Sequence, residues 1–266
     1  MPQHLVVGFR GSIGKRHTRI LKTLGQETIG WDKDEYPECN PDYVWICTPD
    51  SCKDEYIKKF DDKKIFVEKP YIGEMKGDIW VACNYRFHPA VKVLKENLSK
   101  VGEVLYCRMH FSHYLPNQRE NWQEYMKGTN IVLDVGWHFI DLALWLFSKV
   151  DDWQRLSSCQ ELTFDDFATI ELLHRKVNTQ IFLDYLRRDK SWGIEVVGKK
   201  GTLKLDASQK NPEICFVTFD NEKNGDILYK GYVASDEPFE NQTEFLLKNW
   251  QSNIKEAMEV AKICQS

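Results

Sequence analysis

Short apolar runs alternate with helical patterns over the first 82 residues, and this alternation restricts the fold more than any other feature. The run His4–Gly8 is typical of a short strand, and it leads through glycines into a helical pattern over 11–24 that ends at Gly25. Three more strand-like runs follow, at 28–31, 43–47 and 64–67. A short polar helix is expected between the last two, over 53–60. Short strands joined by helices form parallel sheets with crossover connections. The first part of the chain is therefore predicted to be α/β.

The pattern changes at about residue 84. A helix is expected over 89–99, an almost wholly apolar helix over 134–147, and an amphipathic helix over about 241–263. Five runs with a period of two lie between the last two helices, at 169–173, 179–186, 193–197, 201–206 and 215–219. Such alternation predicts an antiparallel or mixed sheet with one covered face. We therefore expect a domain boundary between residues 83 and 84.

Charge and composition exclude several classes of partner. The chain has 266 residues, a formal net charge of -4 and 42% hydrophobic residues. These values give no basic footprint for nucleic acid or an anionic membrane, and no apolar run reaches the length of a membrane span. The N-terminus enters a strand directly, without the pattern of a signal peptide, so a cytoplasmic location is expected. The eight cysteines lack paired metal-ligand spacing, so reduced thiols and no metal site are expected.

A glycine-rich turn lies between the first strand and the first helix. Such a turn lets the backbone approach a pyrophosphate, which then rests on the helix N-terminus. The glycines here are spaced G-x-x-G-x-x-G, whereas the dinucleotide fingerprint is G-x-G-x-x-G. Either the turn carries one extra residue, or Phe9 occupies the place of the first glycine. The candidate cofactor residues of the turn are Gly8, Arg10, Gly11, Ser12, Ile13 and Gly14.

Asp32 ends the second strand 18 residues after Gly14. This spacing is close to that of the acid that binds the adenosine ribose hydroxyls in dinucleotide sites. A carboxylate there repels a 2′-phosphate, which favours NAD over NADP. Nearby cations would partly offset the repulsion: Arg10, Lys15, Arg16 and Lys33. NAD is thus the expected cofactor, with NADP as the alternative.

The tripeptide Glu68-Lys69-Pro70 closes the fourth strand. Pro70 ends ladder pairing and keeps Lys69 extended. Lys69 should therefore project at the carboxyl edge of the sheet, where ligands of doubly wound folds bind. A lysine beside a nicotinamide could stabilise alkoxide character on a substrate hydroxyl as hydride leaves. A surface lysine at a strand end is the plainer interpretation of this tripeptide alone.

The apolar helix over 134–147 contains three ionisable residues, Asp134, His138 and Asp141. On an α-helix they share one face, at i, i+4 and i+7. Ionisable groups on a buried helix are costly unless they are paired or used. A carboxylate one turn before a histidine also orients an imidazole for proton transfer. The alternative is that Asp134 and His138 only pair with each other in a buried core and have no catalytic role.

Taken in order, these motifs resemble the glucose-fructose oxidoreductase, inositol dehydrogenase and rhizopine-catabolism (Gfo/Idh/MocA) oxidoreductases. The landmarks span nearly the whole chain: Gly11-Ser-Ile-Gly14, Cys47-Thr48-Pro49, Glu68-Lys69-Pro70, Asn84-Tyr-Arg86-Phe-His-Pro89, Asp134-x-x-x-His138-x-x-Asp141 and Gly193-Ile-Glu-Val-Val-Gly-Lys-Lys-Gly201. The resemblance implies an N-terminal Rossmann domain (1–83) and a C-terminal α/β domain (84–266) with an open, mostly antiparallel sheet. It also implies an NAD(P)-dependent oxidoreductase acting on a sugar or nucleotide-sugar, and a homodimer or homotetramer.

By position in the motifs, the resemblance implies roles for single residues. Lys69, Asp134 and His138 match the catalytic lysine and the aspartate–histidine pair. Thr48, Pro49 and Glu68 would join the cofactor site. Tyr85, Arg86 and Asp141 are expected near substrate, together with Arg119 and Trp122 of the loop 113–122, which resembles a sugar-binding loop.

The chain departs from the family pattern at three points. The first glycine of the turn is displaced, and Cys52 and Lys53 lie where many relatives carry a histidine after Thr-Pro. Only 13 residues separate Pro70 from Asn84, too few for the usual helix and strand. These departures keep a second hypothesis open, a degenerate member that binds a nucleotide or a partner without turnover. Reduction of a non-sugar carbonyl or conjugated bond is a third.

Overall fold

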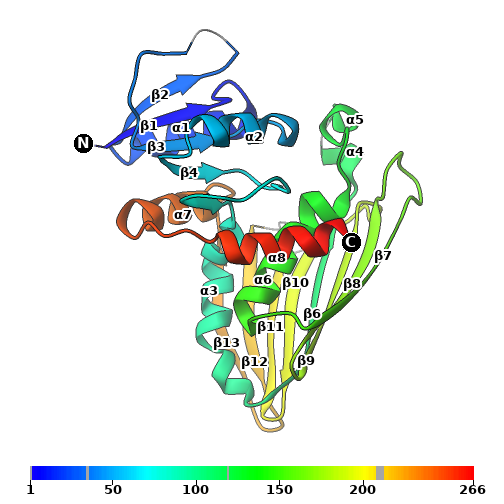
Figure 1. Ribbon diagram of the computed structural model, residues 1–266. Coiled ribbons are helices and arrows are strands. Elements are labelled where there is room, and N and C mark those ends of the chain that lie inside the picture. The colour runs from blue at the N-terminus through cyan, green and yellow to red at the C-terminus, as the bar shows by residue number, and fades with distance from the viewer. Residues whose placement is uncertain (1, 34–35, 119, 208–212) are drawn as a thin grey trace. The chain divides into compact units, whose positions relative to one another are not determined.

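The computed structural model describes residues 2–33, 36–118, 120–207 and 213–266. The chain forms two compact units (Figure 1). Unit 1 comprises residues 1–84 and 236–265, and unit 2 comprises residues 85–235 with Ser266. Within the described ranges, no helix combines the length and the apolar character needed to cross a membrane.

Unit 1 is built on a five-stranded parallel sheet in the order β2-β1-β3-β4-β5. The strands are β1 (Gln3–Val7), β2 (Glu27–Trp31), β3 (Tyr43–Ile46), β4 (Lys64–Val67) and β5 (Ile79–Val81). The central strands are continuous apolar runs because both faces of a parallel sheet are covered. Leu5, Val44, Ile46 and Val67 are fully buried. The strand order reverses between β1 and β3, so the carboxyl ends of these two strands form a topological switch point.

The described part of unit 1 also contains the helices α1 (Ser12–Thr23), α2 (Asp50–Lys59), α7 (Glu237–Lys248) and α8 (Ile254–Gln265). Helices α7 and α8 belong to unit 1, although more than 150 residues separate them in the sequence from strand β5. Gln242 accepts a hydrogen bond from the Cys83 backbone N–H at 2.8 Å. Asn253 accepts from the Val81 N–H at 2.7 Å and donates to the Val81 carbonyl at 2.9 Å. The amide of Asn253 thus pairs with edge strand β5 as a further strand would.

Unit 2 is built on an eight-stranded sheet in the order β13-β12-β11-β10-β6-β9-β8-β7. Among the strand pairs that the described residues form in this sheet, only β6 and β9 run parallel. The strands are β6 (Val104–Ser112), β7 (Asp152–Ser158), β8 (Phe167–His174), β9 (Val177–Asp184), β10 (Ser191–Gly198), β11 (Gly201–Ala207), β12 (Ile214–Asp220) and β13 (Gly225–Tyr232). Burial alternates along most of them, as expected for a sheet with one covered face.

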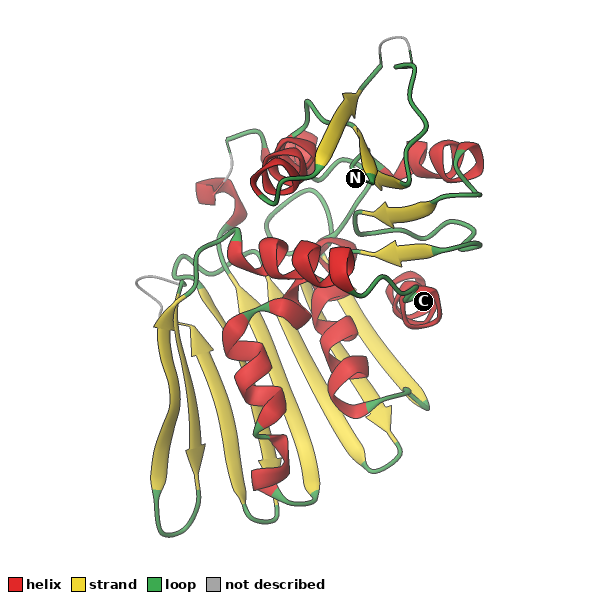
Figure 2. Ribbon diagram, turned by 90° about the vertical axis from the view of Figure 1, so that its left-hand side faces the viewer, coloured by secondary structure: helices red, strands yellow, loops and turns green. Residues whose placement is uncertain are grey.

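The helices α3 (Pro89–Glu96) and α6 (Trp137–Phe147) of unit 2 lie along one face of this sheet (Figure 2). Helix α3 contacts β11 and β12, and helix α6 with the turn before it contacts β9. The helical segments are η1 (Asn84–Phe87), which begins at the last residue of unit 1, α3 (Pro89–Glu96), η2 (Leu98–Val101), α4 (Leu115–Gln118), α5 (Trp122–Tyr125), the π-helical η3 (Val132–Gly136) and α6 (Trp137–Phe147). Helix α6 is buried on nearly all sides, which explains its apolar sequence.

The predicted fold class is confirmed, a parallel Rossmann-like sheet followed by an open, mostly antiparallel sheet. Three predicted elements differ. The segment after Pro70 keeps a strand, β5, although it is too short for a helix as well. The helix expected at about 241–263 is two helices, α7 and α8. The helix expected over 134–147 begins as a π-helix, which spans Val132–Gly136.

The compact units also divide the chain differently from the predicted domains 1–83 and 84–266. Residues 236–265 belong with the first unit. The reason is the pairing of Gln242 and Asn253 with Cys83 and Val81, contacts between residues about 160 to 170 positions apart. No local pattern in the sequence predicts these long-range contacts.

We predict that Asn253→Ala lowers the free energy of unfolding by about 2–4 kcal/mol, because it leaves the buried N–H and C=O of Val81 without their partners. Urea titration measures this loss. Gln251→Ala, at an exposed position two residues earlier, is the control and should change stability by less than about 0.5 kcal/mol. Equal effects of the two substitutions would contradict the strand-pairing role.

Candidate functional site

The glycine-rich turn lies at the switch point of the unit 1 sheet. Gly8 follows β1 with φ +79°, and a side chain there would meet the Cys47 carbonyl oxygen at 2.8 Å. Gly14 faces the same turn, where a Cβ would lie 2.1 Å from the Gly8 carbonyl oxygen. The Gly11 N–H closes the turn onto the Gly8 carbonyl at 3.0 Å. Glycine is therefore required sterically at Gly8 and Gly14, and the N-terminus of α1 reaches close to β1.

Phe9 follows Gly8 in the turn, at the position that separates this glycine spacing from the dinucleotide fingerprint. Its ring packs over Gly30 of β2, where a Cβ would meet the ring at 2.5 Å. The sequence left two interpretations of the displaced glycine. In the structure Gly8 takes the left-handed conformation and Phe9 turns its side chain against β2.

Asp32 lies beside this turn. Its carboxylate accepts hydrogen bonds from the Arg10 backbone N–H at 3.2 Å and from the Lys33 N–H at 3.1 Å. The acid after β2 and the turn after β1 are thus joined directly. Within α1, which the structure describes throughout, no side chain caps the N-terminus and no acidic residue occupies the first turn. These helix N–H groups are suited to an anion.

Thr48 and Pro49 follow β3 on the other side of the switch point. Pro49 is the N-cap residue of α2, and the Thr48 methyl group lies 3.3 Å from where a Gly8 side chain would begin. The Thr48 hydroxyl is buried and, among the described residues, has no hydrogen-bond partner. A ligand hydroxyl could supply one. The structure thus brings together Gly8, Thr48 and Pro49, all predicted to bind cofactor.

The tripeptide Glu68-Lys69-Pro70 follows β4 at the same edge of the sheet, with a cis peptide bond between Lys69 and Pro70. The Glu68 side chain is directed into unit 1, where its carboxylate bonds to Nε2 of His17 at 2.7 Å. Burial raises the pKa of Glu68, but the His17 hydrogen bond and the nearby cations outweigh it and lower the pKa overall. The carboxylate therefore stays ionised and holds α1 against β4.

Sequence analysis missed Lys53 as a site residue. It is 1% exposed, and its ammonium group donates to the carbonyl oxygens of Glu68, at 2.6 Å, and of Pro70. The available signal was its position on α2, since Lys53 lies four residues before the buried Ile57 on the same face of the helix.

In unit 2, Asp134 belongs to the π-helical turn that precedes α6. Its two carboxylate oxygens accept hydrogen bonds from two tyrosine hydroxyls, Tyr125 at 2.8 Å and Tyr185 at 2.6 Å. Because the backbone between Asp134 and His138 passes from π-helix to α-helix, the spacing of i, i+4 no longer has its α-helical meaning here. Neither tyrosine was a candidate on sequence grounds, because both pairings depend on tertiary structure.

His138 lies in the first turn of α6 and stacks on the ring of Tyr85, with 4.4 Å between ring centroids and 6° between planes. Tyr85 in turn contacts Trp192 of β10 at 5.8 Å between centroids. His113, after β6, stacks on Tyr185 at 5.0 Å. Burial, together with the charge of Lys190, lowers the pKa of His113 to about 4 against the opposing charges of Asp134 and Asp184, so this ring is neutral at pH 7. Asp134 and His138 thus lie among aromatic side chains.

Asp141, one turn further along α6, is 3% exposed and pairs with Arg86. The guanidinium donates from Nε at 2.8 Å and from Nη2 at 2.6 Å, a two-point ion pair. The structure therefore brings together two of the predicted substrate residues, engaged with each other. Trp122 begins α5 and contacts the ring of Phe164 at 6.0 Å between centroids. Arg119 lies outside the described residues.

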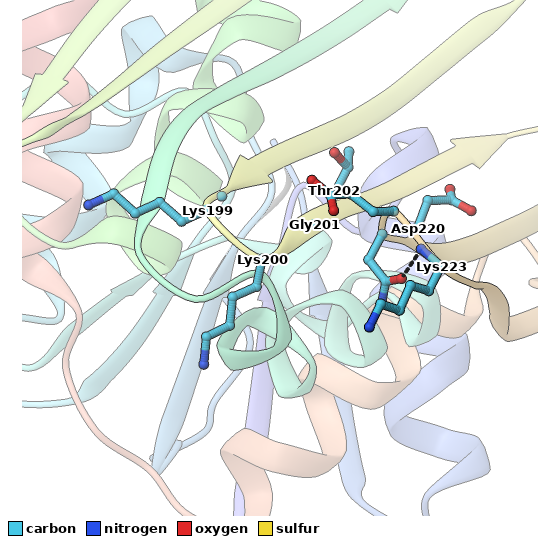
Figure 3. Close-up of a pocket in the computed structure, with 9 residues that line it drawn as sticks. Lys199, Lys200, Gly201, Thr202, Asp220 and Lys223 are labelled. Carbon is cyan, nitrogen blue, oxygen red and sulfur yellow. Dashed lines mark hydrogen bonds between the residues drawn. The ribbon is translucent and has the colours of Figure 1, made fainter.

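A surface hollow of about 670 Å³ lies at the tips of two hairpins of unit 2, away from all these residues. Its lining includes Lys199, Lys200, Thr202 and Asp220. Figure 3 shows the side chains of Lys199 and Lys200 pointing away from each other. Lys199 is paired with Glu103 at 2.6 Å. Lys199 and Lys200 therefore do not converge on one point of the hollow.

Comparison with known proteins confirms the resemblance inferred from the motifs. Residues 94–204 match the model of the GFO/IDH/MocA C-terminal domain. An uncharacterized protein of Saccharomyces cerevisiae is 28% identical over 240 residues, which cover 77% of this chain and 66% of that protein. The chain thus spans about two thirds of the length of this curated relative.

Solved structures share the fold at low identity. An oxidoreductase from Agrobacterium radiobacter, in complex with NAD+, L-tartaric acid and magnesium, has a TM-score of 0.80 at 13% identity, over 99% of this chain and 94% of its own. UDP-N-acetylglucosamine 3-dehydrogenase from Acidithiobacillus ferrooxidans has a TM-score of 0.78 at 12% identity, over 99% of this chain and 95% of its own. Both similarities extend over both units.

We predict that Tyr185→Phe lowers the free energy of unfolding by about 1–3 kcal/mol, because it removes a donor from the Asp134 carboxylate at a site where the tyrosine is 1% exposed. Tyr125→Phe removes the other donor, but Tyr125 is 37% exposed and water can replace it, so a loss below about 1 kcal/mol is expected. Denaturant unfolding of the two variants side by side measures the difference. A larger loss for Tyr125→Phe would contradict the assignment.

Proposed function

Since residues 94–204 carry the GFO/IDH/MocA C-terminal domain, we propose that this protein is an NAD-dependent oxidoreductase acting on a hydroxyl or keto carbon of a sugar or nucleotide-sugar. The observation that carries the proposal is the junction of the Gly8 turn, the uncapped N-terminus of α1 and Asp32 at the switch point of a parallel sheet. This is where doubly wound folds bind dinucleotides. The solved relative in complex with NAD+ supports the same cofactor class.

The residues of this edge fit a dinucleotide. Backbone N–H groups of Ser12, Ile13 and Gly14 at the uncapped start of α1 would face the pyrophosphate, and Gly11, whose own N–H closes the turn onto Gly8, would line it. Asp32 would accept from the adenosine ribose hydroxyls, with the Arg10 N–H already fixing its carboxylate. Thr48 and Pro49 would border the nicotinamide ribose, and the buried Thr48 hydroxyl is suited to that contact.

Glu68 contributes to this site through its buried bond to His17 of α1. A direct contact of Glu68 with the cofactor remains a prediction from the family motif. When bound, the dinucleotide supplies or accepts the hydride, and the chain's own residues handle the proton and the substrate oxygen.

We assign the acid–base chemistry to three side chains. In the oxidation direction, His138 takes the substrate hydroxyl proton and Asp134 orients the histidine. By its position in the family motif, Lys69 would donate a hydrogen bond to the substrate oxygen and stabilise its developing negative charge. Tyr85 stacks on His138 and restricts the imidazole to one plane, which supports this role. The ion pair of Arg86 with Asp141 holds the η1 segment to α6 and so positions Tyr85, the neighbour of Arg86.

The substrate class rests on chemistry and on relatives. A sugar offers the hydroxyl groups that Asp134, Trp122 and the tyrosines of unit 2 can bind by hydrogen bonds and ring contacts. UDP-N-acetylglucosamine 3-dehydrogenase is a solved relative with this substrate class. Arg119 remains a prediction for a sugar contact, and assembly into a homodimer or homotetramer remains a proposal.

We expect Lys69→Ala and His138→Ala each to lower turnover by about 10²–10⁴-fold, the typical contribution of a positioned acid–base group. Binding of NADH, measured by its fluorescence, should change less than about twofold. Turnover is measured by NADH formation or oxidation with a panel of sugars and nucleotide-sugars. Lys58→Ala, an exposed lysine of α2, is the control and should retain full rate. Wild-type protein that fails to bind NADH would overturn the cofactor assignment, and NADH binding without turnover would favour the non-catalytic hypothesis.

We expect Asp32→Ala to raise the affinity for NADPH relative to NADH by about tenfold or more, because the carboxylate no longer repels the 2′-phosphate or binds the ribose hydroxyls. The ratio of the two Kd values, from fluorescence titration, is the measurement. Asp62→Ala removes an exposed carboxylate elsewhere in unit 1 and should leave the ratio unchanged. An unchanged ratio in Asp32→Ala would remove Asp32 from the ribose site.

A further inference from the structure

Lys53 is a buried cation that the proposed chemistry does not use. It is 1% exposed on α2, among the largest fully buried side chains of the protein. A buried ammonium group is costly unless each of its donors has a partner. Burial lowers the pKa of Lys53, and the neighbouring carboxylates Asp50 and Glu68 oppose this effect. The partners of Lys53 therefore indicate why the chain retains a lysine here.

Those partners lie on both sides of Lys69. The Lys53 ammonium donates to the carbonyl oxygen of Glu68 at 2.6 Å and to that of Pro70. Its counter-charge comes from its own helix, since Asp50 Oδ1 lies 3.5 Å from Nζ. One side chain thus binds the main chain immediately before and immediately after Lys69.

A second contact fixes the Glu68 side chain from the opposite element. The Glu68 carboxylate bonds to His17 of α1, so Glu68 is held by its carbonyl oxygen to α2 and by its carboxylate to α1. The main chain around Lys69 therefore has little freedom to move. A lysine suits the α2 position because its long stem spans the distance and its ammonium group can donate to two carbonyls with the Asp50 carboxylate as the nearby counter-charge.

We propose that Lys53 is a positioning residue, which fixes the main chain on both sides of Lys69 and thereby sets where the Lys69 ammonium can reach. The inference rests on the proposed function, in which Lys69 acts on the substrate oxygen. Lys53 itself touches neither substrate nor cofactor in this role. Its contribution is to keep Lys69 in one place, because a small displacement of a catalytic group costs a large factor in rate.

The test compares Lys53→Met with Tyr71→Phe. Lys53→Met keeps the apolar stem but loses the bonds to Glu68 and Pro70. Tyr71→Phe loses the neighbouring bond between the same segment and α2, from the Tyr71 hydroxyl to Asp54 at 2.7 Å, and leaves the carbonyls beside Lys69 untouched. Lys53→Arg, which keeps a cation with several donors, is the conservative variant.

The first measurement is hydrogen exchange of the backbone amides, which needs no substrate. In Lys53→Met, the amides of Glu68, Lys69 and Tyr71 should exchange at least tenfold faster, while those of β1 and β3 keep their rates. Unchanged exchange at these amides would overturn the proposal. Faster exchange throughout unit 1 would also overturn it, since that result indicates a general loss of stability.

The second measurement is kinetic, with NADH and the sugar or nucleotide-sugar identified by the turnover assay. Lys53→Met should lower kcat by tenfold or more while the Kd for NADH changes less than twofold, and Lys53→Arg should recover most of kcat. Tyr71→Phe should retain kcat. An unchanged kcat in Lys53→Met, or an equal loss in Tyr71→Phe, would overturn the positioning role. If the wild type binds NADH but turns over no substrate, the proposed function fails, and the exchange result still decides whether Lys53 fixes this segment.

Discussion

The buried charges of Glu68 and Lys53 are the constraint on which the carboxyl edge of the unit 1 sheet depends. A carboxylate and an ammonium group inside a protein each cost several kcal/mol unless they are paired and hydrogen-bonded. Here the carboxylate meets His17, and the ammonium group meets two main-chain carbonyls and Asp50. Satisfying these groups requires α1, β4 and α2 to lie in one arrangement. The polar interior therefore specifies the geometry of the edge more strictly than apolar packing alone would.

The same edge shows how steric and electrostatic requirements act together. Gly8 and Gly14 allow α1 to begin close to β1, and this approach brings the helix N–H groups to the turn. Asp32 is held at the turn by the Arg10 N–H, so a carboxylate and a set of free helix N–H groups occupy neighbouring positions. A ligand that carries both a phosphate and ribose hydroxyls matches this pair of groups, because the N–H groups bind anions and the carboxylate accepts from hydroxyls.

Sequence reasoning succeeded where the determinants are local. The alternation of strands and helices, the turn at Gly8 and the spacing to Asp32 are short-range patterns, and the structure has all three. It was less complete where a contact joins distant residues. The partners of Asp134 are Tyr125, nine residues away, and Tyr185, 51 residues away. Helices α7 and α8 join unit 1 through Gln242 and Asn253, for which no periodicity gives a signal.

The π-helical turn at Asp134 illustrates why even a correct helix prediction can mislead about side-chain direction. An α-helix over 134–147 would place Asp134, His138 and Asp141 in one row, as one shared polar face. The wider π-turn changes the direction of Asp134 relative to α6, and its carboxylate meets two tyrosines. Asp141, within the regular part of α6, is engaged by Arg86. Asp141 therefore has a partner of its own and is held in a two-point ion pair. A wider turn of this kind costs some regular hydrogen bonding, and such turns occur often at functional sites. The π-turn at Asp134 therefore agrees with the proposed functional role of that carboxylate. The ion pair of Asp141 with Arg86 agrees with a structural role for Asp141.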